Sequence, residues 1–137
     1  MAIKTKYKYI IDGRNVVFNI GYQGRMVDEF ILLLKTNEIT QLVDLREKPY
    51  SRIKGFSKNV LAKELEKAGI TYCWMGSILG GLTCDEQSWK TGCQQLAEKA
   101  ETETLAIMCM ERDVKDCHRM KLAEMLAADH KIHNINL

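Results

Sequence analysis

Apolar residues along this chain follow two alternating spacings. Short runs of mostly apolar residues predict strands, and segments with apolar residues three and four positions apart predict helices. The expected strands cover residues 6–11, 15–21, 39–45, 70–74, 104–110 and 130–137, and the expected helices cover 25–35, 58–68, 87–100 and 114–128. Because strands alternate with helices, we expect an α/β protein: a three-layer sandwich with a mainly parallel central sheet, Rossmann-like or flavodoxin-like.

Three local signals refine this pattern. The Asp12-Gly13 dipeptide is typical of a tight hairpin turn and predicts that the first two strands pair as an N-terminal hairpin. Ser57 is expected to cap the next helix, because its hydroxyl can accept a hydrogen bond from a first-turn amide. Gly80 and Gly81 lack the spacing of a dinucleotide-binding fingerprint, so they predict an unusual turn or a close approach to a ligand.

Length, charge and cysteine content narrow the class of protein. The 137 residues fit a single domain spanning 1–137, and 20 basic against 18 acidic residues give a net charge of +2, too small to indicate nucleic-acid binding by itself. The five cysteines are odd in number and lack disulfide-scaffold spacing, which predicts a reducing compartment. With no signal peptide and no apolar run of transmembrane length, we expect a cytoplasmic protein that has no membrane partner.

Polar and reactive residues follow the predicted strands rather than precede them. In open α/β sheets, ligands bind beyond the carboxyl ends of the strands. At or just beyond those ends lie Tyr22, then Asp44, Arg46, Ser51 and Arg52, then Trp74, Gly80 and Gly81, and finally Cys109 and Glu111, followed by Cys117, His118 and Arg119 in the first turns of the next predicted helix. The connections from helix to strand are short and carry no comparable residues. The sequence therefore predicts a composite site at one edge of the sheet.

An ordered set of short motifs carries a family resemblance. These motifs are Ile20-Gly-Tyr, Leu42-Val-Asp-Leu-Arg, Pro49-Tyr-Ser-Arg, Gly69-Ile-Thr-Tyr, Leu79-Gly-Gly, Cys109-x-Glu and Cys117-His-Arg. Over about residues 16–126 the chain resembles the family called "domain of unknown function 488", although that family often has more residues around the Leu-Gly-Gly loop. The resemblance implies a small cytoplasmic α/β protein without an established substrate. It also implies a shared site of Tyr22, Asp44, Arg46, Ser51, Arg52, Tyr72, Gly80, Gly81, Cys109, Glu111, Cys117, His118 and Arg119.

The leading hypothesis is a small enzyme, of the hydrolase or transferase type, acting on an anionic substrate. Arg46, Arg52 and Arg119 would clamp a phosphate or carboxylate, because a planar guanidinium can bind either in a bidentate manner. Asp44, Glu111 and His118 would supply acid–base or nucleophilic chemistry on a nucleotide-like or phosphorylated molecule. In the structural alternative, the two carboxylates each pair with an arginine.

Two further hypotheses use other residues. Cys117 in the first turn of a helix, beside His118 and Arg119, could serve a thiol-dependent enzyme or a redox sensor with Cys109 as its partner. No metal is expected, because the eight-residue separation of these two cysteines matches no standard zinc pattern, and no cofactor is expected either. The third hypothesis is a non-catalytic module that binds nucleic acid or protein through the basic loop 46–54.

Overall fold

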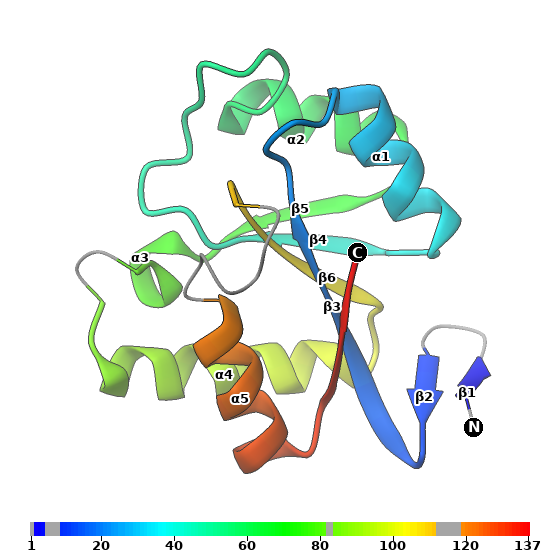
Figure 1. Cartoon of the computed structure of the whole chain (residues 1–137), viewed down its shortest axis with the longest axis vertical. Helices are drawn as coiled ribbons and strands as arrows, with labels where there is room; N and C mark the ends of the chain where they lie inside the picture. The colour runs from blue at the N-terminus through cyan, green and yellow to red at the C-terminus, as the bar shows by residue number, and fades with distance from the viewer. Residues whose placement is uncertain (1, 5–8, 82–83, 112–118) are drawn as a thin grey trace.

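A mixed, mainly parallel β-sheet forms the centre of the computed structural model, which describes residues 2–4, 9–81, 84–111 and 119–137 (Figure 1). Its strands are β1 Ala2–Lys4, β2 Tyr9–Ile11, β3 Arg14–Gly21, β4 Gln41–Asp44, β5 Thr71–Trp74, β6 Leu105–Cys109 and β7 His133–Asn136. The order is β1-β2-β3-β6-β4-β5, and β7 also pairs with β3. The pairings of β1 with β2 and of β2 with β3 are antiparallel, and the other four are parallel. The expected α/β class and mainly parallel sheet are confirmed.

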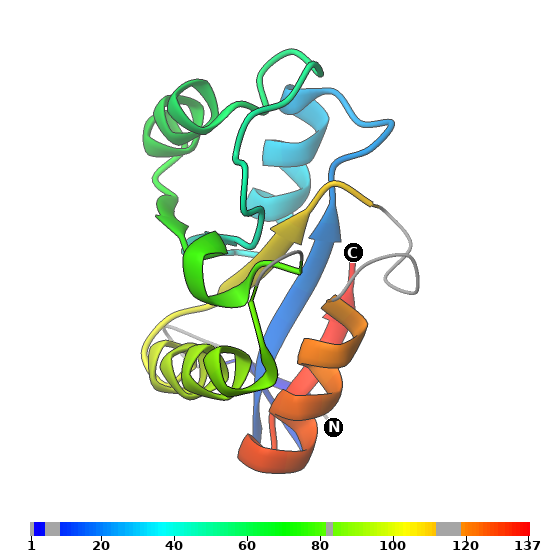
Figure 2. The ribbon, with the colours of Figure 1, turned by 90° about the vertical axis from the view of Figure 1, so that its left-hand side faces the viewer.

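Helices cover both faces of the sheet (Figure 2). The described helices are α1 Val27–Thr36, α2 Lys58–Lys67, α3 Gly76–Leu79, α4 Glu86–Ala100 and α5 Arg119–His130. In β3, Val16, Phe18 and Ile20 share a core with α1 and α2, whereas Val17 shares the opposite core with α4 and α5. This alternation follows from strand geometry, because successive side chains point to opposite faces. Within the described residues, no helix combines the length and the apolar character needed to cross a membrane.

The strand order directs neighbouring connections to opposite faces. The chain leaves β3 and β4 toward α1 and α2, and it reaches α4 after β5 and α5 after β6. Since β6 lies between β3 and β4, the connections diverge on both sides of its carboxyl end. Such divergence marks the place where open α/β sheets bind ligands. In the Rossmann and flavodoxin orders the first two parallel strands are neighbours, so this order, with β6 between β3 and β4, differs from both.

The N-terminal hairpin is confirmed. Strands β2 and β3 pair in antiparallel register, with Ile11 opposite Arg14. The two residues between them, Asp12 and Gly13, have φ values of 50° and 74°. Positive φ at both central positions is the geometry of a type I′ turn, which matches the right-handed twist of the flanking strands. Strand β1, which extends this hairpin, was not predicted.

The other elements follow the apolar pattern with two differences. Ser57 precedes α2 but makes no side-chain capping bond, so that prediction is wrong. Its hydroxyl instead donates to the Ser51 carbonyl at 3.2 Å and accepts from the Ser51 amide at 3.0 Å. The short helix α3 lies inside the segment 75–86, which the apolar pattern assigns to neither a strand nor a helix. The predicted start of the last helix, residues 114–118, lies outside the described residues.

Candidate functional site

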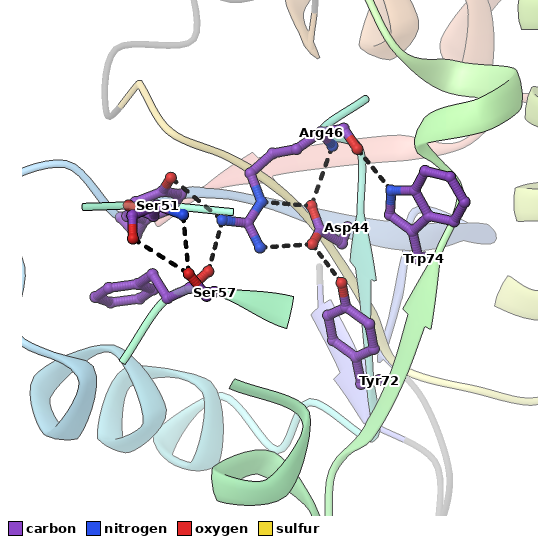
Figure 3. Close-up of polar contacts among 8 residues, drawn as sticks. Asp44, Arg46, Ser51, Ser57, Tyr72 and Trp74 are labelled. Carbon is purple, nitrogen blue, oxygen red and sulfur yellow. Dashed lines mark hydrogen bonds and ion pairs between the residues drawn. The ribbon is translucent and has the colours of Figure 1, made fainter. Parts of the chain in front are cut away.

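A buried ion pair occupies the carboxyl end of β4 (Figure 3). Arg46 places Nη2 2.7 Å from Oδ2 of Asp44 and Nε 2.9 Å from Oδ1, while its backbone amide donates to Oδ1 at 3.0 Å. Asp44 has no exposed surface, and Arg46 is 8% exposed. Burial alone would lower the pKa of Arg46, but the hydrogen-bonded Asp44 carboxylate more than offsets this, so its pKa is raised and Arg46 stays charged.

Arg46 also closes the loop that leads from β4 to α2. Its Nη1 donates to the Phe56 carbonyl at 2.6 Å and to the Tyr22 hydroxyl at 3.3 Å. The Tyr22 ring stacks on the Phe56 ring, with 4.4 Å between their centroids, and the Arg46 guanidinium carbon lies 5.2 Å from the Tyr22 centroid. One guanidinium therefore joins the ends of β3 and β4 to the base of α2.

Two aromatic residues of β5 complete this network (Figure 3). The Tyr72 hydroxyl donates to Oδ2 of Asp44 at 2.5 Å, and Trp74 Nε1 donates to the Arg46 carbonyl at 2.6 Å. Burial, together with the bond to Asp44, raises the pKa of Tyr72 above its usual range. The ammonium of Lys58 lies 4.8 Å from the centroid of the Trp74 ring, a cation–π contact.

Two glycines allow the backbone of the following segment to approach this network. A Cβ on Gly76 would lie 1.9 Å from the Arg46 carbonyl oxygen and 2.5 Å from Trp74 Nε1. A Cβ on Gly80 would lie 1.9 Å from Cγ of Glu47 and 2.5 Å from the Gly76 carbonyl. Gly80, with φ of −65°, is thus needed for a close approach to another part of the chain, and not for an unusual backbone angle.

The carboxyl end of β6 is arranged differently. Glu111 is partly exposed, and its Oε2 lies 3.3 Å from Sγ of Cys109. Within the described residues its carboxylate forms no salt bridge. Arg119, at 1% exposed, donates through Nη2 to the backbone carbonyl of Glu111 and so fixes its main chain. The end of β6 offers an accessible carboxylate, whereas the end of β4 offers a closed ion pair.

Comparison with known proteins identifies the family. The model of the family described as "Domain of unknown function DUF488" matches residues 26–91 and 83–126, which is most of the chain. The chain belongs to the DUF488 family. Neither a curated protein nor a solved structure matches the chain significantly. The resemblance carried by the sequence motifs is confirmed.

The DUF488 motif residues fall into two contacting groups. The first group joins four of the predicted site residues, Tyr22, Asp44, Arg46 and Tyr72. The second joins Cys109, Glu111 and Arg119. Ser51 braces the loop through Ser57, while Arg52 and Gly81 are exposed. Gly80 accepts a hydrogen bond from Trp89 Nε1 at 3.0 Å and packs against Glu47.

The thiol and metal predictions remain untested. Cys117 and His118 lie outside the described residues. Cys109 is disulfide-bonded, and Cys73, Cys84 and Cys93 are free. No group of three or more potential metal ligands occurs in the part of the chain that the structure describes.

Sequence reasoning missed the residues that act through their backbone. The carbonyl of Phe56 accepts the 2.6 Å bond from Arg46, and the carbonyl of Arg46 accepts the 2.6 Å bond from Trp74. Gly76 was missed as well, although a glycine just beyond a strand end is the residue type that allows a close approach of two backbone segments. A backbone acceptor leaves no such signal, because every residue has a carbonyl.

Proposed function

We propose that this DUF488 protein is a small enzyme of the hydrolase or transferase type, acting on a nucleotide-like or phosphorylated substrate beyond the carboxyl ends of β3, β6 and β4. Glu111 would act as general base or nucleophile: as a base it would accept the proton of an attacking water or hydroxyl. One observation carries the proposal: the accessible Glu111 carboxylate lies at the end of β6, where the connections of the sheet diverge.

The roles of the other acidic and basic residues follow from their contacts. Asp44 has its carboxylate filled by Arg46 and Tyr72, so it orients the loop and takes no proton from a substrate. The guanidinium of Arg46 likewise donates hydrogen bonds to Asp44, to Tyr22 and to the Phe56 carbonyl, so it is occupied within the protein. The anion clamp of the proposal therefore excludes Arg46, and Arg52, which is exposed, is its accessible guanidinium. Arg119 positions the backbone of Glu111.

Two finer assignments belong to the same proposal. Helices α1 and α2 pack on one face of the sheet and α3, α4 and α5 on the other, and this supports a three-layer sandwich whose strand order departs from the Rossmann and flavodoxin types. A cytoplasmic location remains our expectation. The thiol-dependent alternative depends on Cys117 and keeps its own test, the rate of alkylation as a function of pH.

The test is a turnover screen of the wild-type chain on nucleoside mono-, di- and triphosphates and on sugar phosphates, read by chromatography of the products. For any compound converted, Glu111→Gln is expected to lower kcat by about 10²-fold to 10⁴-fold, the usual contribution of a general base. Glu98→Gln, at an exposed position of α4, is the matched control and should keep full activity. Conversion by Glu111→Gln at the wild-type rate, or no conversion of any compound by the wild type, would contradict the proposal.

A further inference from the structure

Positive charge is concentrated in one segment of the chain. Residues 48–63 contain Lys48, Arg52, Lys54, Lys58 and Lys63 and no acidic residue, which leaves 15 basic against 18 acidic residues elsewhere. The small net charge of the whole protein hides this separation. A local excess of one sign attracts an oppositely charged partner even when the total charge is near zero.

The loop that carries the first three of these cations is held in one conformation. Arg46 donates to the Phe56 carbonyl at 2.6 Å across its base, and the Lys58 amide donates to the Pro49 carbonyl at 2.7 Å. The Ser51 amide donates to the Ser57 hydroxyl at 3.0 Å. Because these bonds already order the backbone, a partner that binds here loses less conformational entropy on binding.

This braced loop presents an aromatic ring to solvent between its cations. Tyr50 is 71% exposed and is the only aromatic residue among the large exposed apolar side chains of the described residues. Lys48, Arg52 and Lys54 are exposed as well, whereas Pro49 and Phe56 of the same loop are buried. The loop thus separates an inner, packed side from an outer side of one flat ring and three cations.

We infer that the outer side of this loop, formed by Lys48, Tyr50, Arg52 and Lys54, binds single-stranded nucleic acid. Unpaired bases expose their faces and can stack on Tyr50, while the three cations contact the phosphates on either side. A duplex would offer its phosphates but not a base face, so single strands are favoured. The inference goes beyond the proposed activity and does not depend on Glu111.

The test is fluorescence anisotropy of the whole chain with labelled 12-nucleotide oligo-dT and oligo-rU, titrated with salt. Three phosphate contacts predict a log–log salt slope of about −2, since each contact on a single strand contributes about −0.7. Tyr50→Ala is expected to weaken binding roughly 5-fold to 150-fold through the loss of stacking on one base, whereas Tyr50→Phe should bind like the wild type. Arg52→Glu combined with Lys54→Glu should reduce binding further and flatten the slope.

The matched control reverses two cations elsewhere. Lys35→Glu combined with Lys90→Glu changes the net charge equally, at exposed positions of α1 and α4, and should leave most of the binding intact. Equal loss in the two double variants, or a Tyr50→Ala variant that binds like the wild type, would overturn the inference. So would a duplex of the same length that binds as tightly as the single strand. Binding retained by Glu111→Gln separates this inference from the proposed activity, because that variant loses turnover only.

Discussion

Two adjacent parallel strands, β4 and β6, are each associated with an acidic residue: Asp44 is the last residue of β4, and Glu111 lies two residues beyond the end of β6, in opposite surroundings. At the end of β4, Asp44 is fully buried and saturated by Arg46 and Tyr72. At the end of β6, Glu111 is partly exposed, contacts Cys109 Sγ, and forms no salt bridge within the described residues. Both residues lie in family motifs at the carboxyl edge of the sheet, where open α/β sheets generally bind ligands. Position in the fold therefore does not decide which carboxylate is available for chemistry.

The difference arises from how much hydration each carboxylate has lost on folding and how many hydrogen bonds it has gained. A buried charge gives up hydration worth several kcal/mol, and only good geometry and further hydrogen bonds restore it. Asp44 has both, so its carboxylate is committed to holding the loop 45–57 against the sheet. Glu111 keeps part of its contact with water, as the proposed role in binding a substrate requires. We call the buried Asp44–Arg46 pair with Tyr72 the closed site, and the partly exposed Glu111 carboxylate the open site.

The largest effect should come from breaking the closed site. Asp44→Asn keeps the shape of the side chain but leaves the Arg46 charge buried without a counterion, which is expected to cost about 3–5 kcal/mol of unfolding free energy. Urea unfolding followed by circular dichroism measures it. Glu64→Gln is the control, because it removes the exposed pair of Glu64 and Lys67, where we expect at most about 1 kcal/mol. A similar loss in the two variants would mean that Asp44 and Arg46 are not a buried structural pair.

The sequence predicted strands β4 and β6 and the position of an acidic residue near the carboxyl end of each. Strands β4 and β6 are short apolar runs, and each acidic residue stands at or just after the end of its run. The order of the strands was not predictable, because which runs become neighbours depends on packing between segments far apart in the chain. Placing β6 between β3 and β4 is what brings Glu111 next to the other strand ends.

The roles within the site were less predictable than its location. Asp44 and Arg46 are two positions apart, which is compatible with an ion pair and equally with a clamp for a substrate. The ion pair is distinguished from the substrate clamp by the burial of both side chains and by their further hydrogen bonds, which involve Tyr22, Phe56 and Tyr72. Those partners come from three different segments of the chain, and no local sequence pattern predicts that they contact one another.

An intermediate effect should come from Tyr72, at the rim of the closed site. Tyr72→Phe removes one hydrogen bond to a charged acceptor and is expected to cost about 1.5 kcal/mol near neutral pH. The pKa of Tyr72 is raised in the folded state, so its stabilisation is complete below the usual tyrosine value of 10.0 and decreases as the pH rises beyond it. Above pH 10, the unfolding free energy of the wild type should fall by up to about 1.4 kcal/mol per pH unit because of Tyr72.

The pH dependence makes this prediction specific to Tyr72. The difference in unfolding free energy between wild type and Tyr72→Phe should be constant from pH 7 to 9 and should narrow between pH 10 and 11. Tyr50→Phe, at an exposed ring, is the control and should show neither the difference nor the narrowing. A difference that widens above pH 10 would contradict the assigned bond to Asp44.

The smallest effect on stability is expected at Glu111, and it is the sharpest test of the contrast. Glu111→Gln changes a partly exposed carboxylate without a salt bridge among the described residues, so unfolding free energy should stay within about 0.5 kcal/mol of wild type. The backbone bond from Arg119 to the Glu111 carbonyl survives, because it does not involve the side chain. A loss as large as that of Asp44→Asn would show that Glu111 also holds the fold together, and the carboxylate would then no longer be available to a substrate. A Glu111→Gln variant that is stable but has lost turnover would instead show that the two acidic residues have different roles, Asp44 in maintaining the fold and Glu111 in the proposed chemistry.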